Sequence, residues 1–233
     1  MGTCNDCSMR NRLADDTVTD MERADFQEVL HRFERWRAIA TMLGQKPYDE
    51  PDFDNGRLYF RSDYAEQVAK WPDAREKGDW GAYVIESTAT GLFSVVRSLW
   101  HERAPERSED LEVMFSRPDD AGKYVIAHVA NSIRFGTGLK SRSISWRELG
   151  LDRSIVISPP TDEQFRLYFE AIPGADPVEL RGYLNQYTVE GASQIYAVTS
   201  SENRPYMQVL ARSFDQLDAE LLKGLPIASA PAS

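Results

Sequence analysis

The sequence predicts an α+β fold, a mainly antiparallel β-sheet with about three flanking helices. Several short segments rich in β-branched and aromatic residues are separated by turn-forming residues, which is typical of strands. They follow one another without long helices between them, and this spacing favours antiparallel pairing. Three longer segments carry apolar residues at intervals of three and four, so we expect helices packed against the sheet.

The chain divides into one folded unit and two terminal tails. Residues 1–19 are polar, and we expect a disordered tail there. Residues 20–224 are predicted to form a single α+β domain that begins with a helix over 20–43, capped by Asp20 and ended by Gly44. Residues 225–233 are expected to form a loose C-terminal tail.

The first half of the domain reads as strands followed by a helix. The stretch KPYDEPDFDNG, with two prolines and an Asn-Gly pair, predicts a loop. Pro118, followed by Asp119 and Asp120, is typical of a helix start, and this helix should continue to Gly136. The strands before it are expected at 57–64, 82–87, 93–99 and 111–115.

The second half predicts further strands and a last helix. Residues 180–199 are ambiguous but lean toward strand because polar and apolar residues alternate. A final helix from Pro205 to Lys223 should bury one apolar stripe and stop at Gly224. The remaining strands are expected at 141–146, 155–158 and 165–171, and the buried stripe consists of Met207, Leu210, Phe214, Leu217 and Leu221.

Composition narrows the function classes. The formal net charge is -10 and the isoelectric point about 4.9, which argues against a nucleic-acid partner and is compatible with a basic protein partner. The sequence has no apolar run long enough to span a membrane and no apolar signal core, so we expect a cytoplasmic protein without membrane contact. Cys4 and Cys7 resemble half a zinc site or a redox pair; without a second half, we expect no metal and no cofactor.

Catalytic signatures are missing from the sequence. It contains no GxSxG, GxGxxG or GxxxxGK[ST] motif, and the glycines of FGTGLKS follow a helix instead of preceding one. We interpret His128 as a satisfied core or edge histidine and His101 as solvated. The chain is therefore expected not to be an enzyme. An enzyme with scattered catalytic groups, for example Glu86, Asp110 and Glu170, remains an alternative, as does a scaffold or phage-type accessory protein.

The segment KYVIAHVANSIRF carries the strongest candidate for a site. Asn131 and Arg134 lie three residues apart in the last turn of a predicted helix, beside a glycine-containing loop. Arg134 could simply complement the helix dipole, or the helix end and the loop could form a recognition surface. The predicted partner-binding residues are Asn131, Arg134, Gly136, Thr137, Gly138 and Lys140.

Residues GAYVIES and DLEVMFSRPDDAGKYVIAHVANSIRFGTGL resemble the central part of a known family. The shared features are a tyrosine-containing strand, a helix start with an aspartate and a tyrosine, and a helix that ends in Ile-Arg before a glycine-leucine loop. They are similar to the actinobacterial immunity proteins that neutralise NAD glycohydrolases of the tuberculosis necrotizing toxin type. The resemblance covers residues 55 to 170 and excludes the N-terminal helix.

The resemblance implies a non-catalytic α+β antitoxin. Such a protein binds its cognate toxin and occludes the cleft that holds NAD. Occlusion requires complementary shape and charge, and an acidic antitoxin would suit a toxin cleft that is basic because it holds a pyrophosphate. The predicted partner is therefore a cognate toxin protein.

Overall fold

The computed structural model describes residues 23–62, 69–70, 81–100 and 107–227. The predicted tail 1–19, Cys4, Cys7 and His101 lie outside these ranges. The described elements are, in chain order, η1 (Arg23–Phe26), α1 (Gln27–Met42), β1 (Asp52–Asp54), β2 (Arg57–Arg61), β3 (Gly81–Ser87), β4 (Phe93–Trp100), β5 (Arg107–Phe115), α4 (Pro118–Gly136), α5 (Arg142–Leu149), β6 (Ile155–Ser158), α6 (Asp162–Glu170), α7 (Pro177–Tyr183), β7 (Leu184–Val189), β8 (Ala192–Ser200), η2 (Ser201–Ala211) and α8 (Phe214–Leu222).

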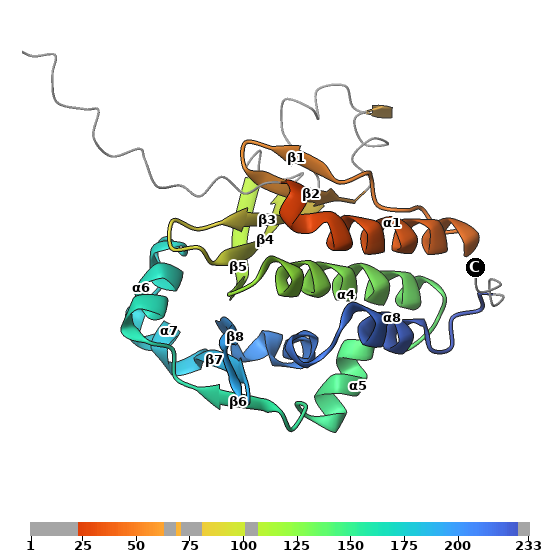
Figure 1. Cartoon of the computed structure of the whole chain (residues 1–233). Helices are drawn as coiled ribbons and strands as arrows, with labels where there is room; N and C mark the ends of the chain where they lie inside the picture. The colour runs from red at the N-terminus through yellow and green to blue at the C-terminus, as the bar shows by residue number, and fades with distance from the viewer. Residues whose placement is uncertain (1–22, 63–68, 71–80, 101–106, 228–233) are drawn as a thin grey trace, which may run out of the picture.

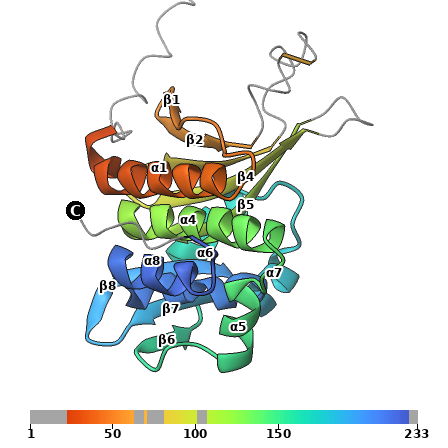
Figure 2. The ribbon, with the colours of Figure 1, turned by 90° about the vertical axis from the view of Figure 1, so that its right-hand side faces the viewer.

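The strands form one eight-stranded sheet in the order β1-β2-β3-β4-β5-β8-β7-β6. Every neighbouring pair is antiparallel, as the sequence predicted. The two halves of the sheet meet where β5 pairs with β8 over three residues only. Figure 1 shows α1, α4 and α8 side by side, and Figure 2 shows them from a second direction on the same side of the sheet.

The helix-covered face holds the main core. Phe33 and Trp36 of α1, Tyr124 of α4 and Phe115 of β5 are fully buried there. The opposite face carries a smaller cluster in which α6 and α7 cover β5 and β8 with Phe165 and other apolar side chains. The sheet is therefore sandwiched between helices over part of its area, which agrees with the α+β prediction.

A β-bulge fixes the middle of the sheet. Val95 lies opposite Val113 and Val96 lies opposite Leu111, so Glu112 is the extra residue on β5. The main-chain oxygen of Glu112 accepts hydrogen bonds from Thr199 Oγ1 at 2.5 Å, Asn203 Nδ2 at 3.0 Å and Tyr168 Oη at 3.2 Å. The bulge thus ties β5 to β8, to η2 and to α6.

Several predicted elements differ from those found. The described residues contain six α-helices and two 3-10 helices, more than the three expected. Residues 141–146 and 165–171 were predicted as strands, but they lie in the helices α5 and α6. The reason for α6 is a capping box, in which Thr161 and Gln164 bond to each other's main-chain N–H groups. A short apolar segment fits both the helical and the strand period, and here the capping box makes the segment helical.

The last predicted helix is two elements. The 3-10 helix η2 runs to Ala211, and α8 begins at Phe214 after Ser213 forms a second capping box with Gln216. The predicted loop 46–56 contains the short edge strand β1, followed by a turn with Asn55 at φ 50° and Gly56 at φ 71°. Two left-handed residues are typical of a tight hairpin turn, and this one joins β1 to β2.

Candidate partner-binding site

Helices α1 and α4 run parallel and approach closely at both ends. Near their beginnings, a Cβ atom on Gly122 would lie 2.2 Å from Val29 Cγ2. Near their ends, a Cβ atom on Gly136 would lie 2.6 Å from Gln45 Oε1, and Gln45 Nε2 donates to the main-chain oxygen of Ile133 at 2.8 Å. The C-terminal ends of the two helices therefore lie at the same end of the molecule.

Asn131 is turned inward and joins two neighbouring elements. It is 6% exposed, its Oδ1 accepts from the main-chain N–H of Arg142 at 2.8 Å, and its Nδ2 donates to Tyr206 Oη at 3.4 Å. The first bond fixes the start of α5 against α4, and the second reaches η2. Its side chain therefore positions the loop that links α4 to α5.

Arg134 is also turned inward. It is 4% exposed, and its Nη1 donates to the main-chain oxygens of Leu221 at 2.8 Å and Lys223 at 2.7 Å. Its Nε donates to the main-chain oxygen of Lys140 at 3.2 Å. Burial, together with the charge of Arg142, lowers the pKa of Arg134. The guanidinium thus satisfies carbonyls at the end of α8 and fixes the glycine loop.

The remaining predicted residues form the outer side of the loop. Gly138, at φ 76°, is exposed, Thr137 is half-buried, and Lys140 donates to Glu148 at 2.6 Å on the surface. Gly136 lies against Gln45. Asn131 and Arg134 are buried, and their hydrogen bonds hold this loop in place. Contact between the loop and a partner stays a prediction.

The sequence did not single out two exposed apolar residues in the last turns of α1 and α4. Phe135 is 80% exposed in the last turn of α4, and Met42 is 65% exposed in the last turn of α1. Both lie off the buried stripes of their helices. An apolar residue off such a stripe is predicted to be exposed, so the sequence could have identified both. We call the helix-end surface the set Met42, Phe135, Gly136, Thr137, Gly138 and Lys140.

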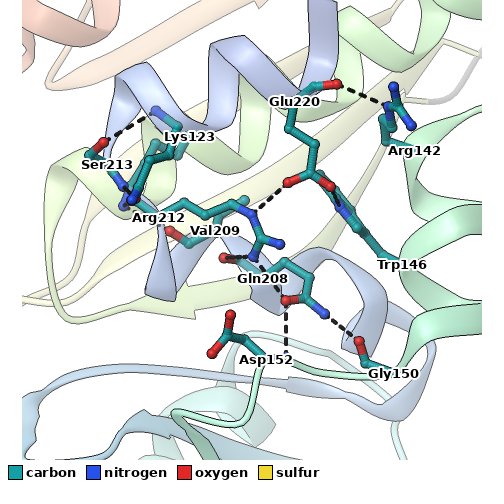
Figure 3. A network of polar contacts seen from close by, with 11 residues as sticks. Lys123, Arg142, Trp146, Gly150, Asp152, Gln208, Val209, Arg212, Ser213 and Glu220 are labelled. Carbon is teal, nitrogen blue, oxygen red and sulfur yellow. Dashed lines mark hydrogen bonds and ion pairs between the residues drawn. The ribbon is translucent and has the colours of Figure 1, made fainter. Parts of the chain in front are cut away.

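A polar network binds α5, η2 and α8 together (Figure 3). Glu220 accepts from Trp146 Nε1 at 2.5 Å and from Arg212 Nε at 2.7 Å. Burial alone would raise the pKa of Glu220, but these two partners hold it below its usual value. Gln208 extends the network by donating to the main-chain oxygen of Gly150 at 2.6 Å.

His128 lies inside an aromatic cluster between α4 and the sheet. Its ring stacks on Tyr206 with centroids 3.9 Å apart, and its Nδ1 shares a hydrogen bond of 2.9 Å with Tyr83 Oη. Burial, and to a lesser degree the charge of Arg97, lowers the pKa of His128 to about 3. Its Nε2 is buried without a hydrogen-bond partner. The side chain is half-buried and neutral, and only one of its two ring nitrogens has a hydrogen-bond partner, so the expectation of a fully satisfied histidine is met in part.

The carboxylates considered for catalysis lie apart. Glu86 pairs with Arg57 at 2.9 Å, and Arg57 also pairs with Glu109. Asp110 follows Glu109 on β5 and therefore projects from the opposite face of the sheet. Glu170 pairs with Arg166 on α6 at 3.0 Å. Because each lies in a different setting, the described contacts do not assemble them into one site.

The described part of the chain holds neither a metal-ion cluster nor a membrane-spanning helix. Within it, no group of three or more His, Cys, Asp and Glu side chains is arranged to hold a metal ion. Among its helices, none has both the length and the apolar character needed to cross a bilayer.

These features define a single-sheet α+β protein with a rigid, partly apolar surface at one end of two parallel helices. No family model and no curated protein sequence matches the chain. Among solved structures, Rv3902c from M. tuberculosis has a similar fold, with a TM-score of 0.50 and 14% sequence identity, over 90% of this chain and 95% of that chain. At this identity the likeness concerns the fold.

Proposed function

We propose that this protein is a non-catalytic immunity protein, which binds a cognate secreted toxin of the NAD glycohydrolase type and covers its active-site cleft. The observation that carries the proposal is the helix-end surface, where Phe135 is 80% exposed beside the glycine loop. Large aromatic residues are frequent anchors of protein interfaces, because they bury much apolar area at low cost in conformational entropy.

The position of this surface supports the proposal. The segments that resemble the immunity proteins include β3, part of β5 and all of α4, and Phe135 belongs to the last of these. Asn131 and Arg134 hold the following loop from inside the molecule. A surface fixed in this way loses little entropy on binding, which favours tight association. The net charge of -10 adds attraction toward a basic cleft.

The test uses the product of the neighbouring gene as the toxin. We expect the wild-type chain to inhibit NAD hydrolysis at one-to-one stoichiometry, and Phe135→Ala to weaken inhibition by about thirtyfold while the melting temperature stays unchanged, as for an interface anchor. Val178→Ala is the matched control, because Val178 is equally exposed at 80% but lies on α7.

The outcomes test the immunity function and the helix-end surface separately. If the wild-type chain neither binds the toxin nor inhibits it, the immunity function is wrong. If it inhibits and Phe135→Ala inhibits equally well, the function stands and the helix-end surface is not the contact.

A further inference from the structure

A groove on another part of the molecule carries a charge opposite to that of the whole chain. It lies between the end of α5 and the beginning of η2 and has a volume of about 720 Å³. A smaller hollow of about 240 Å³ adjoins it and shares Trp146, Gly150 and Leu151 with it. The two together form one groove at the end of α5.

Arginines dominate the charged residues along this groove. Four arginines line it, Arg147 and Arg204 in the larger part and Arg153 and Arg212 in the smaller, against two carboxylates, Glu202 and Asp152. Glu220 neutralises Arg212, so three positive charges minus two negative charges leave the groove at +1, on a chain whose formal net charge is -10. We name it the arginine groove.

Three of the arginines are available to bind a ligand. Arg212 is occupied by Glu220 and Gln208. Arg147, Arg153 and Arg204 are exposed, and none of them pairs with a carboxylate of the described residues. Most other arginines of the described helices have such a pair, for example Arg32 with Asp218 and Arg166 with Glu170. Unpaired guanidinium groups in one groove are available for carboxylate or phosphate oxygens.

The floor of the groove is rigid. Gln208 Oε1 accepts from the main-chain N–H of Asp152 at 3.1 Å, and its Nε2 donates to the main-chain oxygen of Gly150 (Figure 3). Trp146 is held by Glu220. The loop after α5 is therefore fixed against η2, and the groove exists before any ligand arrives, which reduces the entropy cost of binding.

We propose that the arginine groove binds an extended, acidic peptide segment of a partner protein. The unpaired arginines come from both parts of the groove, Arg147 and Arg204 in the larger and Arg153 in the smaller, so successive carboxylates of one extended chain can reach them. Leu149, 83% exposed, and the half-buried Leu151 provide apolar surface for a side chain between the acidic residues. A nucleotide fits less well, because Trp146 is 1% exposed and offers no open ring face on which a base could stack.

The acidic segment of the partner would bind in the arginine groove and not on the helix-end surface, because the two surfaces attract opposite charges. The groove attracts carboxylates, whereas most of the acidic chain attracts basic groups, so a partner that used both surfaces would carry both charges. The inference stands on the groove itself and does not depend on the partner being a toxin.

The test is a titration of the full chain with a peptide at low ionic strength, in which ¹H–¹⁵N NMR monitors the amide signals. The probe is the peptide acetyl-Glu-Glu-Leu-Glu-Glu-amide, and the neutral control replaces each glutamate by glutamine. We expect the acidic peptide to shift the amide signals of Gly150, Leu151 and Ser201, and the shifts to shrink with added salt. The neutral peptide should leave these signals in place.

Two double variants make the test specific. Arg147→Gln with Arg204→Gln should weaken peptide binding by about tenfold, because both walls of the groove lose their charge. Arg97→Gln with Arg166→Gln removes the same total charge from β4 and α6 and should leave binding unchanged. The proposal is overturned if both double variants bind equally, if no groove signal shifts, or if inorganic pyrophosphate shifts these signals and the peptide does not.

Discussion

The Nη1 atom of Arg134 donates a hydrogen bond to the main-chain oxygen of Leu221 at 2.8 Å and thereby joins the end of α4 to the end of α8. These residues are 87 positions apart in the sequence. The same guanidinium also reaches Lys223 and Lys140. A residue that the sequence placed on a recognition surface therefore holds three parts of the chain together.

Arg134→Ala should destabilise the fold. The variant leaves buried main-chain oxygens without a donor, and we expect a loss of about 2–4 kcal/mol in the free energy of unfolding. Urea denaturation followed by circular dichroism measures it. Lys140→Ala, on the exposed side of the same loop, should change stability by less than about 0.5 kcal/mol. Equal stability of Arg134→Ala and the wild type would show that Arg134 does not hold the loop.

Gly122→Ala tests the close approach of α1 and α4. The added Cβ would overlap Val29, so we expect a loss of about 1–3 kcal/mol from overpacking. Combining it with Val29→Ala should cost less than the sum of the two single changes, because the second substitution makes room. Gly182→Ala is the control: nothing lies within 4 Å of its Cβ position, and thermal stability should not fall. Additive losses in the double variant would argue against the contact.

Phe214 and Leu217 of the last helix, α8, differ in burial. The sequence placed Phe214 and Leu217 on one buried stripe, but Phe214 is half-buried at the start of α8, whereas Leu217 is 0% exposed. Leu217→Ala should therefore cost about 2–5 kcal/mol and Phe214→Ala less than about 2 kcal/mol. Chemical denaturation of both variants decides, and the reverse order would contradict this description of α8.

His128 should make stability depend on pH. Its pKa is about 3 in the folded state and near 6.5 when unfolded, so below pH 6.5 the unfolded state gains the proton first. This contribution is complete above pH 6.5 and is lost progressively as the pH falls toward 3, by about 2 kcal/mol at pH 5.

The measurement compares unfolding free energies at pH 7 and pH 5 for the wild type and for His128→Gln, which cannot titrate. The drop between the two pH values should be larger in the wild type by about 2 kcal/mol. Equal drops would mean that His128 is accessible to protons in the folded state.

Elements whose local signals agreed were predictable. The start of α4 at Pro118 and the strand β6 were expected where they occur, because proline and acidic residues define the first and β-branched residues the second. α5 and α6 were mistaken for strands, since each is short and its apolar residues fit either period. Their caps, Ser141 and Thr161, form hydrogen bonds that the apolar pattern does not reveal.

By itself, the sequence determined the α+β class, the antiparallel pairing and the acidic charge, because these follow from composition and from periodic apolar residues. The tertiary structure decided which polar residues face inward. Arg134 and Phe135 are adjacent in one helical turn, yet the arginine is 4% exposed and the phenylalanine 80%. The physical reason is that the main-chain oxygens at the end of α8, brought there by long-range packing, need donors, and Arg134 is within reach of them.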